Sequence, residues 1–269
     1  MSAQHPQVTI QDTEVHRLSS AHVDQEYNIL VALPPGYADS DKTYPTLYTT
    51  DGDLVFGAVT QIARLVAVGK TIPQLVVVGI GYPVHWTKTS PYRERDYIPE
   101  GWHQKHPSGR AGNFLRFVCE ELIPWVGSEY RVDPQDRCYG GDSHGGLFGV
   151  YTLLTRPGAF SRYLIGSPTI YHEDPEVFRC ERDYAATHSD LRARVCMYMG
   201  QLEDETQIAN TRRLCQILEG RGYDGLHLNL RVFDGQTHQS VIPYFFTGLN
   251  EVYSQGSGKG RLRQSQRLK

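Results

Sequence analysis

No stretch of this sequence is apolar for long enough to cross a bilayer, so it contains no candidate for a transmembrane helix. The net charge is also low, because 27 Lys and Arg stand against 30 Asp and Glu and leave a formal charge of −3 at pH 7. Without a strong charge of either sign, electrostatics give no reason to expect a nucleic acid or an anionic membrane as partner.

Cysteine is scarce and shows no pattern. The five cysteines are odd in number, widely scattered and free of C-x-x-C spacing, which argues against a disulfide framework and against a zinc site. The segment Met1–Glu14 lacks the apolar core of a secretory signal. We therefore expect a cytoplasmic protein with no metal or other cofactor.

The composition shows no shift along the chain. An apolar fraction of 39% over 269 residues is enough for a sizeable core. We expect one domain over residues 1–253. Residues 254–269 combine Gly, Ser and Gln with basic residues, and this composition predicts a disordered basic tail.

Strand-like and helix-like segments alternate through the chain. Two N-terminal segments alternate apolar and polar residues, as antiparallel strands do, and the apolar run 75–81 suits a central parallel strand. Repeated β-α alternation predicts an α/β fold: a mostly parallel, doubly wound sheet with helices on both faces and antiparallel N-terminal strands. Expected strands cover 7–16, 27–33, 44–50, 75–81, 137–140, 163–167, 195–200 and 226–232; expected helices cover 56–68, 113–130 with a break at Pro124, 147–154, 175–188, 206–220 and 241–253.

One long segment lacks this periodicity. Residues 82–110 are rich in Pro, His, Tyr, Trp and Arg, and a loop of this length inside a compact domain is typically a lid or a binding loop. Its aromatic and histidine side chains either line a pocket for an aromatic substrate or pack against the protein. These side chains are Trp86, Tyr92, Trp102, His103 and His106.

The stretch Gly141-Asp142-Ser143-His144-Gly145-Gly146 lies between a strand-like and a helix-like segment. It fits the G-x-S-x-G pattern, which holds a serine hydroxyl on a sharp strand-to-helix turn at the top of an α/β-hydrolase sheet. Glycines suit this turn because Cβ atoms beside the serine would collide with the neighbouring strand and helix. Alone, the pattern is equally typical of an ordinary Gly-rich turn, so its partners decide the interpretation.

A nucleophilic serine needs a base and an orienting acid, and in α/β-hydrolases both follow the serine, the acid first. His238 lies between the last expected strand and the last expected helix, where the base is expected. The acid is expected just after the strand 195–200. Glu203 is the favoured residue and Asp204 the alternative. A solvated acidic loop without a role is the remaining interpretation.

Acyl transfer also needs N–H donors for the oxyanion that forms during attack. The backbone N–H of His144 is the first expected donor. The second is expected in the turn Asp51-Gly52-Asp53, from the N–H of Gly52 or Asp53. A plain type I turn is the alternative there.

Six motifs, taken in order, resemble one known family, the enterochelin-esterase and esterase D-like family. The resemblance covers roughly residues 25–250. It implies an α/β-hydrolase fold, no metal, and a serine hydrolase whose best-studied members open ester bonds of catecholate siderophore macrolactones, as ferric complexes or free ligands. The motifs are Leu47-Tyr48-Thr49-Thr50-Asp51-Gly52, Val77-Val78-Gly79-Ile80-Gly81-Tyr82, Arg93-Glu94-Arg95-Asp96-Tyr97-Ile98-Pro99, Gly141-Asp142-Ser143-His144-Gly145-Gly146, Ser167-Pro168-Thr169 and Gly235-Gln236-Thr237-His238-Gln239-Ser240-Val241.

The chain departs from the family beside the expected site. Family members often carry tryptophans after their Ser-Pro-Ser segment, whereas this chain has Tyr171 and His172, so a different substrate wall is expected. The run His172-Glu173-Asp174 is not expected to bind a metal, because consecutive residues do not converge easily on one ion. Some family members work with a Ser-His dyad, which leaves the role of Glu203 open.

Arg93 and Arg95 have two interpretations. A guanidinium fork matches catecholate or carboxylate oxygens, so these side chains are candidates for holding an anionic group of the substrate. Alternatively, Arg95 pairs with Glu94 or Asp96 and only fixes the loop.

The residues together predict a serine esterase whose partner is a small-molecule ester or lactone, with siderophore lactones or their ferric complexes as the preferred class. Three alternatives use the same fold: a general carboxylesterase, an acyltransferase or macrolactone-forming enzyme with the same acyl-serine chemistry, and a catalytically silent binding protein. The sequence leaves the oligomeric state open.

Overall fold

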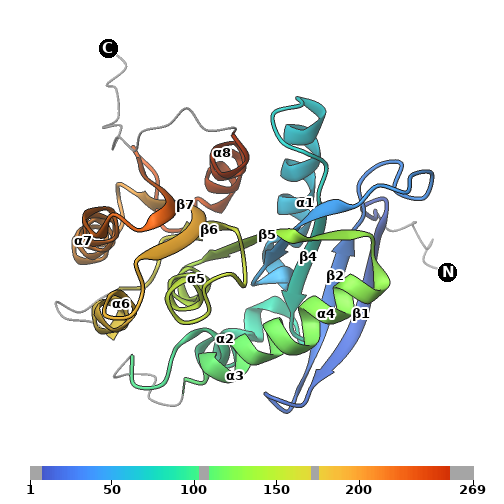
Figure 1. Cartoon of the computed structure of the whole chain (residues 1–269). Helices are drawn as coiled ribbons and strands as arrows, with labels where there is room; N and C mark the ends of the chain where they lie inside the picture. The colour runs from blue at the N-terminus through green and yellow to red at the C-terminus, as the bar shows by residue number, and fades with distance from the viewer. Residues whose placement is uncertain (1–7, 103–108, 171–175, 255–269) are drawn as a thin grey trace.

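The computed structural model of the chain describes residues 8–102, 109–170 and 176–254 (Figure 1). Strands and helices alternate along most of this length. The strands are β1 (Thr13–Ser20), β2 (Gln25–Ala32), β3 (Tyr44–Thr49), β4 (Val76–Gly81), β5 (Val132–Asp142), β6 (Arg162–Gly166), β7 (Asp190–Gly200) and β8 (Asp224–Phe233). The helices are α1 (Gly52–Val68), η1 (Trp86–Lys88), α2 (Ser90–Tyr97), α3 (Ala111–Arg116), η2 (Phe117–Leu122), α4 (Ile123–Glu129), α5 (His144–Thr155), α6 (Glu176–Ala185), α7 (Glu205–Arg221) and α8 (Val241–Tyr253).

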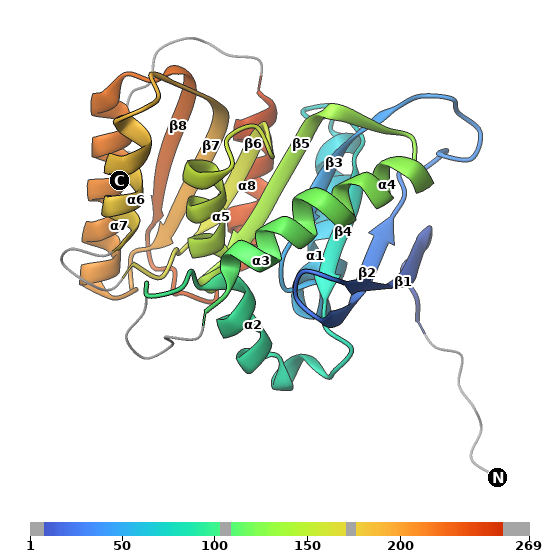
Figure 2. The ribbon, with the colours of Figure 1, turned by 60° about the horizontal axis from the view of Figure 1, so that its bottom comes forward.

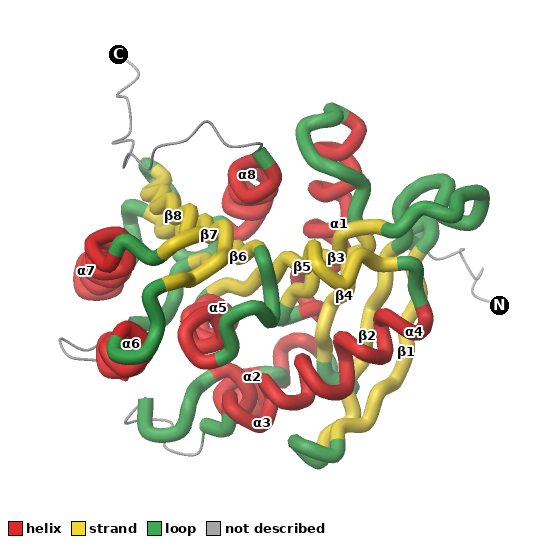
Figure 3. The backbone as a smooth tube through the Cα atoms, viewed as in Figure 1, coloured by secondary structure: helices red, strands yellow, loops and turns green. Residues whose placement is uncertain are grey.

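Within the described residues the strands form one eight-stranded sheet in the order β1-β2-β4-β3-β5-β6-β7-β8. Strand β2 pairs antiparallel with both β1 and β4, and every pairing from β4 through β8 is parallel. This confirms the predicted fold class, a mostly parallel α/β sheet with antiparallel N-terminal strands. Figure 3 shows the strands crossing the molecule between the helices.

Helices pack on both faces of the sheet. Figure 1 shows α1 and α8 on one side of the strands and α2 to α6 on the other, and Figure 2 shows the same two layers from a turned view. The core is divided accordingly. Alternate residues of β4 belong to different clusters, with Val76 and Val78 facing α2 to α7 and Val77 facing α1 and α8. Because both faces are covered, the strand is apolar without a break.

The parallel strands put their carboxyl ends at one edge of the sheet. The segments that follow β3, β4, β5, β6, β7 and β8 therefore begin at that edge. In open α/β sheets, ligands bind outside the carboxyl ends of the strands. Every predicted site residue that the structure describes lies in one of these segments.

The segment 82–110 differs from the expected loop. It contains the short helix η1 and the two-turn helix α2, and residues 103–108 lie outside the described residues. Helix α2 has no apolar stripe to mark it in the sequence. Its inward face instead carries the buried polar side chains Asp96 and Tyr97.

Several element boundaries also differ from expectation, and two of the differences have a clear physical reason. The first strand begins at Thr13 rather than residue 7, because an edge strand with half-exposed side chains gives a weak apolar pattern. The expected helix 113–130 is interrupted by the π-helical turn η2 just before Pro124. Proline removes a backbone donor and crowds the preceding turn, which the wider π turn accommodates. Among the described residues, no helix has the length and apolar character needed to cross a membrane.

Candidate active site

Ser143 lies on a sharp turn between β5 and α5. Its backbone has φ 62° and ψ −122°, a conformation that non-glycine residues rarely adopt. The Ser143 N–H donates to the Gly166 carbonyl at 2.9 Å, which ties the turn to the end of β6. A Cβ on Gly146 would lie 2.2 Å from that same carbonyl oxygen, so only glycine fits there. The predicted strand-turn-helix context of the serine is therefore present.

His238 and Glu203 meet after the last two strands. Glu203 follows β7 and His238 follows β8, and their side chains form a 2.8 Å hydrogen bond between Oε2 and Nδ1. This bond raises the pKa of His238, and burial offsets part of the increase. With Nδ1 held by a carboxylate, the ring presents Nε2 as its acceptor nitrogen.

The Glu203 carboxylate is almost fully buried and has several donors. Its Oε1 accepts hydrogen bonds from the Ser167 hydroxyl at 2.7 Å, from the Gly200 N–H, and from the Tyr244 hydroxyl at 3.5 Å. Burial opposes ionisation, but the hydrogen bonds from His238, Gly200 and Ser167 outweigh it and lower the pKa of Glu203. The side chain is therefore held as a carboxylate in a fixed orientation.

Asp204, the alternative acid, has another place in the fold. It is the N-cap of α7, and its Oδ1 accepts the Gln207 N–H at 3.0 Å. The structure brings Glu203, and not Asp204, to His238.

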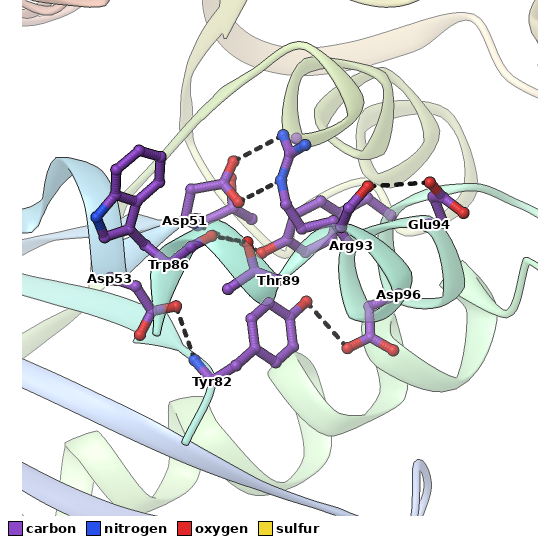
Figure 4. A network of polar contacts seen from close by, with 12 residues as sticks. Asp51, Asp53, Tyr82, Trp86, Thr89, Arg93, Glu94 and Asp96 are labelled. Atoms are coloured by element: carbon purple, nitrogen blue, oxygen red, sulfur yellow. Dashed lines mark hydrogen bonds and ion pairs between the residues drawn. The ribbon is translucent and has the colours of Figure 1, made fainter. Parts of the chain in front are cut away.

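The other predicted donors lie at the first turns of two helices. His144 begins α5 and Gly52 begins α1, and the first N–H groups of a helix have no carbonyl partner within it. Both N-termini point positive dipole ends at this edge of the sheet. A Cβ on Gly52 would lie 2.8 Å from the Gly79 carbonyl carbon, so the turn packs directly against β4. The Asp53 carboxylate accepts the Tyr82 N–H at 2.8 Å (Figure 4).

The two arginines make different ion pairs. Arg95 binds its neighbour Asp96 with both Nε and Nη2, at 2.6 and 2.9 Å, as the second interpretation of Arg95 expected. Arg93 was not expected to bind the oxyanion turn, yet its Nε and Nη2 lie 2.6 and 3.1 Å from the two carboxylate oxygens of Asp51 (Figure 4). Its fork therefore faces a protein carboxylate.

Some aromatic side chains of the segment 82–110 pack against other rings, and another is exposed to solvent. Tyr92 stacks on Tyr82 and Trp102 packs edge-on against Tyr151, with ring centroids 5.2 and 5.6 Å apart. Trp86 is half exposed. The predicted substrate contacts Tyr171 and His172, together with His103 and His106, lie outside the described residues.

Sequence reasoning missed several residues that surround these groups. Ser167 directly follows β6, has φ 41° and donates to the Glu203 carboxylate beside His238. Asp142, directly before Ser143, has a buried Oδ1, and burial raises its pKa to about 7. The position of Asp142 inside the G-x-S-x-G motif was the sequence signal that could have identified it. Within the described ranges, His, Cys, Asp and Glu form no cluster of three or more that suits a metal ion.

Comparison with known proteins identifies the family of the chain. The model of a family described as "Putative esterase" matches residues 20–239. The chain belongs to this esterase family. Over 253 residues, the esterase is 30% identical to the ferri-bacillibactin esterase BesA of Bacillus subtilis, covering 87% of each chain. It is also 31% identical over 168 residues to a siderophore enterobactin esterase of Emericella nidulans, covering 55% of each.

A solved structure resembles the esterase over nearly its whole length. The BES protein from Bacillus cereus superposes with a TM-score of 0.84 at 26% identity, covering 95% of this chain and all of that one. Family and relatives confirm the predicted enzyme class, a carboxylic ester hydrolase, on the predicted fold.

Proposed function

We propose that this esterase uses Ser143 as nucleophile, His238 as general base and Glu203 as the orienting acid, and that its substrates are esters or lactones of the siderophore type. The observation that carries the proposal is the Glu203 carboxylate, buried and hydrogen-bonded on both oxygens, with His238 Nδ1 on one of them. A side chain held in this way fixes both the tautomer and the orientation of the imidazole.

The proposed reaction gives each of these groups one role. His238 Nε2 takes the proton of the Ser143 hydroxyl as Oγ attacks the ester carbonyl, and the carbonyl oxygen becomes an oxyanion. The N–H groups of His144 and of the Gly52-Asp53 turn supply donors for that oxygen. When the tetrahedral intermediate collapses, the C–O bond to the alcohol breaks, and imidazolium returns the proton to the leaving alkoxide.

The second half of the reaction repeats these steps with water. His238 takes a proton from the water as it attacks the acyl-serine, and the same N–H groups bind the second oxyanion. Collapse of this intermediate releases the carboxylic acid, and the proton returns to Ser143 Oγ. Throughout, the negative charge on Glu203 stabilises the imidazolium.

Exposed apolar side chains support a substrate with aromatic or apolar parts. Each follows a parallel strand, so they gather at the same edge as Ser143, and isolated polar substrates would not need them. They are Leu54 in the first turn of α1, Trp86 in η1, Leu202 between β7 and α7, and Ile242 in the first turn of α8. Catecholate siderophores combine aromatic rings with ester bonds, and two relatives are named for siderophore ester cleavage.

The test combines two substrates with one probe. Ser143→Ala should abolish hydrolysis of p-nitrophenyl acetate and labelling by a fluorophosphonate, while the matched variant Ser128→Ala, on the exposed face of α4, should keep both. Retained turnover in Ser143→Ala would overturn the proposed nucleophile. Mass spectrometry of the products from a panel of siderophores and simple aryl esters, with added alcohol acceptors, identifies the preferred substrate class and shows whether water or the alcohol accepts the acyl group. Preferred cleavage of simple esters, or transfer to the alcohol, would overturn the siderophore proposal.

A further inference from the structure

Helix α2 contacts the proposed oxyanion turn, Asp51-Gly52-Asp53, through both the side chain and the backbone of Asp51. The Arg93 guanidinium binds both oxygens of the Asp51 carboxylate, and the Tyr97 hydroxyl accepts the Asp51 backbone N–H at 3.3 Å. Figure 4 shows the Arg93 fork facing Asp51 beside the turn that carries Asp53. The side chain and the backbone of Asp51 are thus both held by the same helix.

Helix α2 is itself anchored to the sheet. Asp96, fully buried, accepts hydrogen bonds from the Tyr27 hydroxyl of β2 at 2.7 Å and the Tyr82 hydroxyl at 3.1 Å, in addition to the fork of Arg95. Tyr97 is fully buried among aromatic side chains of the core. The segment expected to be a lid or a binding loop therefore contains a fixed support that ends at Asp51.

Asp51 precedes a helix, but its side chain does not make the hydrogen bond that an aspartate usually makes there. It precedes α1 as the N-cap, where an aspartate normally accepts an N–H of the first turn. Among the described residues, the Asp51 side chain makes no such capping bond, and its φ of 56° is left-handed. The carboxylate lies on Arg93 instead, so its negative charge is held away from the N-terminal N–H groups of α1.

The Asp51-Gly52-Asp53 turn also contacts the strand-to-helix turn at Ser143, which we call the Ser143 elbow. A Cβ on Gly145 would lie 2.4 Å from Thr50 Oγ1 and 3.7 Å from Asp51 Oδ2. On its other side, Gly52 packs against the backbone of Gly79. A shift of Asp51 therefore changes the position of the α1 N-terminus relative to that of α5.

We propose that Arg93 and Tyr97 are positioning residues, which hold the Asp51-Gly52-Asp53 turn against the Ser143 elbow and keep the Asp51 carboxylate away from the developing oxyanion. The inference rests on the proposed function, because it concerns the donors that this function assigns. The Arg93–Asp51 ion pair is only partly buried, and such a pair contributes little net stability beyond apolar residues of the same volume. Its proposed role is instead to fix the backbone at the oxyanion donors.

The proposal predicts that Arg93→Gln lowers kcat much more than it changes KM. With p-nitrophenyl acetate, which has no anionic group for an arginine to bind, kcat should fall roughly ten- to a hundredfold, less than the roughly 10²- to 10³-fold typical of losing one oxyanion donor. KM should stay within about twofold. Tyr97→Phe, which removes one hydroxyl oxygen, should lower kcat roughly two- to tenfold. Tyr184→Phe is the matched control, because its hydroxyl donates to the Asp190 carbonyl at the start of β7 and contacts neither α2 nor the turn, and it should keep kcat.

The double variant Asp51→Asn with Arg93→Gln separates positioning from simple loss of structure. Arg93→Gln alone leaves an unpaired carboxylate beside the oxyanion, and neutralising Asp51 removes it. The double variant should therefore have a higher kcat per fluorophosphonate-reactive site than Arg93→Gln alone, a non-additive result that a change in the folded fraction alone does not produce. The affinity of a trifluoromethyl ketone, which forms an oxyanion on Ser143, should follow kcat across the series.

Three results would overturn the inference. Wild-type kcat in folded Arg93→Gln and Tyr97→Phe is the first. The second is a raised KM for an anionic ester with unchanged turnover of p-nitrophenyl acetate, which would show that Arg93 binds substrate. In both cases fluorophosphonate labelling of Ser143 leaves the proposed function standing. The third is absence of labelling in the wild-type protein, which removes the proposed function and this inference together.

Discussion

Glu203 and His238 are joined by a 2.8 Å hydrogen bond, yet their side chains differ sharply in exposure, at 1% for Glu203 and 32% for His238. The carboxylate is fixed inside the protein by Ser167 and Gly200, and the imidazole is partly exposed at the surface. A buried acid and an accessible base are what proton transfer to and from a bound ester requires.

The two acids of the loop after β7 should respond differently to the same change. Glu203→Gln keeps the volume but removes the charge that stabilises the imidazolium, so kcat for p-nitrophenyl acetate should fall roughly a hundredfold or more. Asp204→Asn should leave kcat unchanged, because asparagine also caps a helix. Steady-state kinetics of both variants check this, and a larger loss in Asp204→Asn would contradict the assignment of the acid.

The pH dependence follows from the raised pKa of His238. Only the neutral imidazole accepts the serine proton, so kcat/KM should rise with pH, with a midpoint above the usual histidine value of 6.5. The hydrogen bond to Glu203 is the largest cause of the increase. In Glu203→Gln the midpoint should therefore move to lower pH, together with the loss of kcat. A midpoint that stays in place would show that another group controls it.

The sequence was sufficient for the fold class, and for Ser143 and His238 as candidates. Their strands and loops are marked by local patterns: an unbroken apolar run, a Gly-rich turn after a strand, and a loop before the last helix. The choice between Glu203 and Asp204 needed one more local pattern. Asp204 followed three residues later by Gln207 fits the sequence signature of a helix N-terminus, and that signal assigns Asp204 to the helix start.

Local sequence patterns could not predict the contacts of Arg93. Arg93 and Asp51 are far apart in the sequence and meet only because α2 folds back over the turn after β3. Helix α2 has no apolar periodicity, since polar groups such as Asp96 hold it, so the segment 82–110 was interpreted as a loop. Without that helix, no argument from spacing places an arginine on Asp51.

Gly200 should be needed to keep His238 in place. A Cβ at this position would lie 2.4 Å from the Gln236 carbonyl oxygen, two residues before His238. Gly200→Ala should therefore displace the histidine loop and lower kcat roughly tenfold or more, with loss of stability. Gly220→Ala is the matched control, because a Cβ there meets nothing within 4 Å. Gly220 lies in the last turn of α7, so this change should stabilise the protein by less than about 1 kcal/mol and leave kcat unchanged. Equal kinetics in both variants would contradict the prediction.

Asp142 should make stability depend on pH near neutrality. Its carboxyl, directly before Ser143, has a pKa raised by burial from 3.8 to about 7. Between these values the unfolded chain has lost the proton that the folded chain still binds, so a rise in pH through this window lowers the free energy of unfolding. Asp142→Asn does not titrate and should escape this loss.

The stability of Asp142→Asn relative to the wild type should therefore grow from pH 4 to pH 7 and then level off. Denaturant unfolding of both proteins at intervals across this range measures it, and a difference that is constant with pH would contradict the assignment. Because the ionised Asp142 raises the pKa of His238, the same variant should also shift the acid limb of kcat/KM to lower pH. One substitution thus tests whether the residue beside the nucleophile and the base share an electrostatic environment.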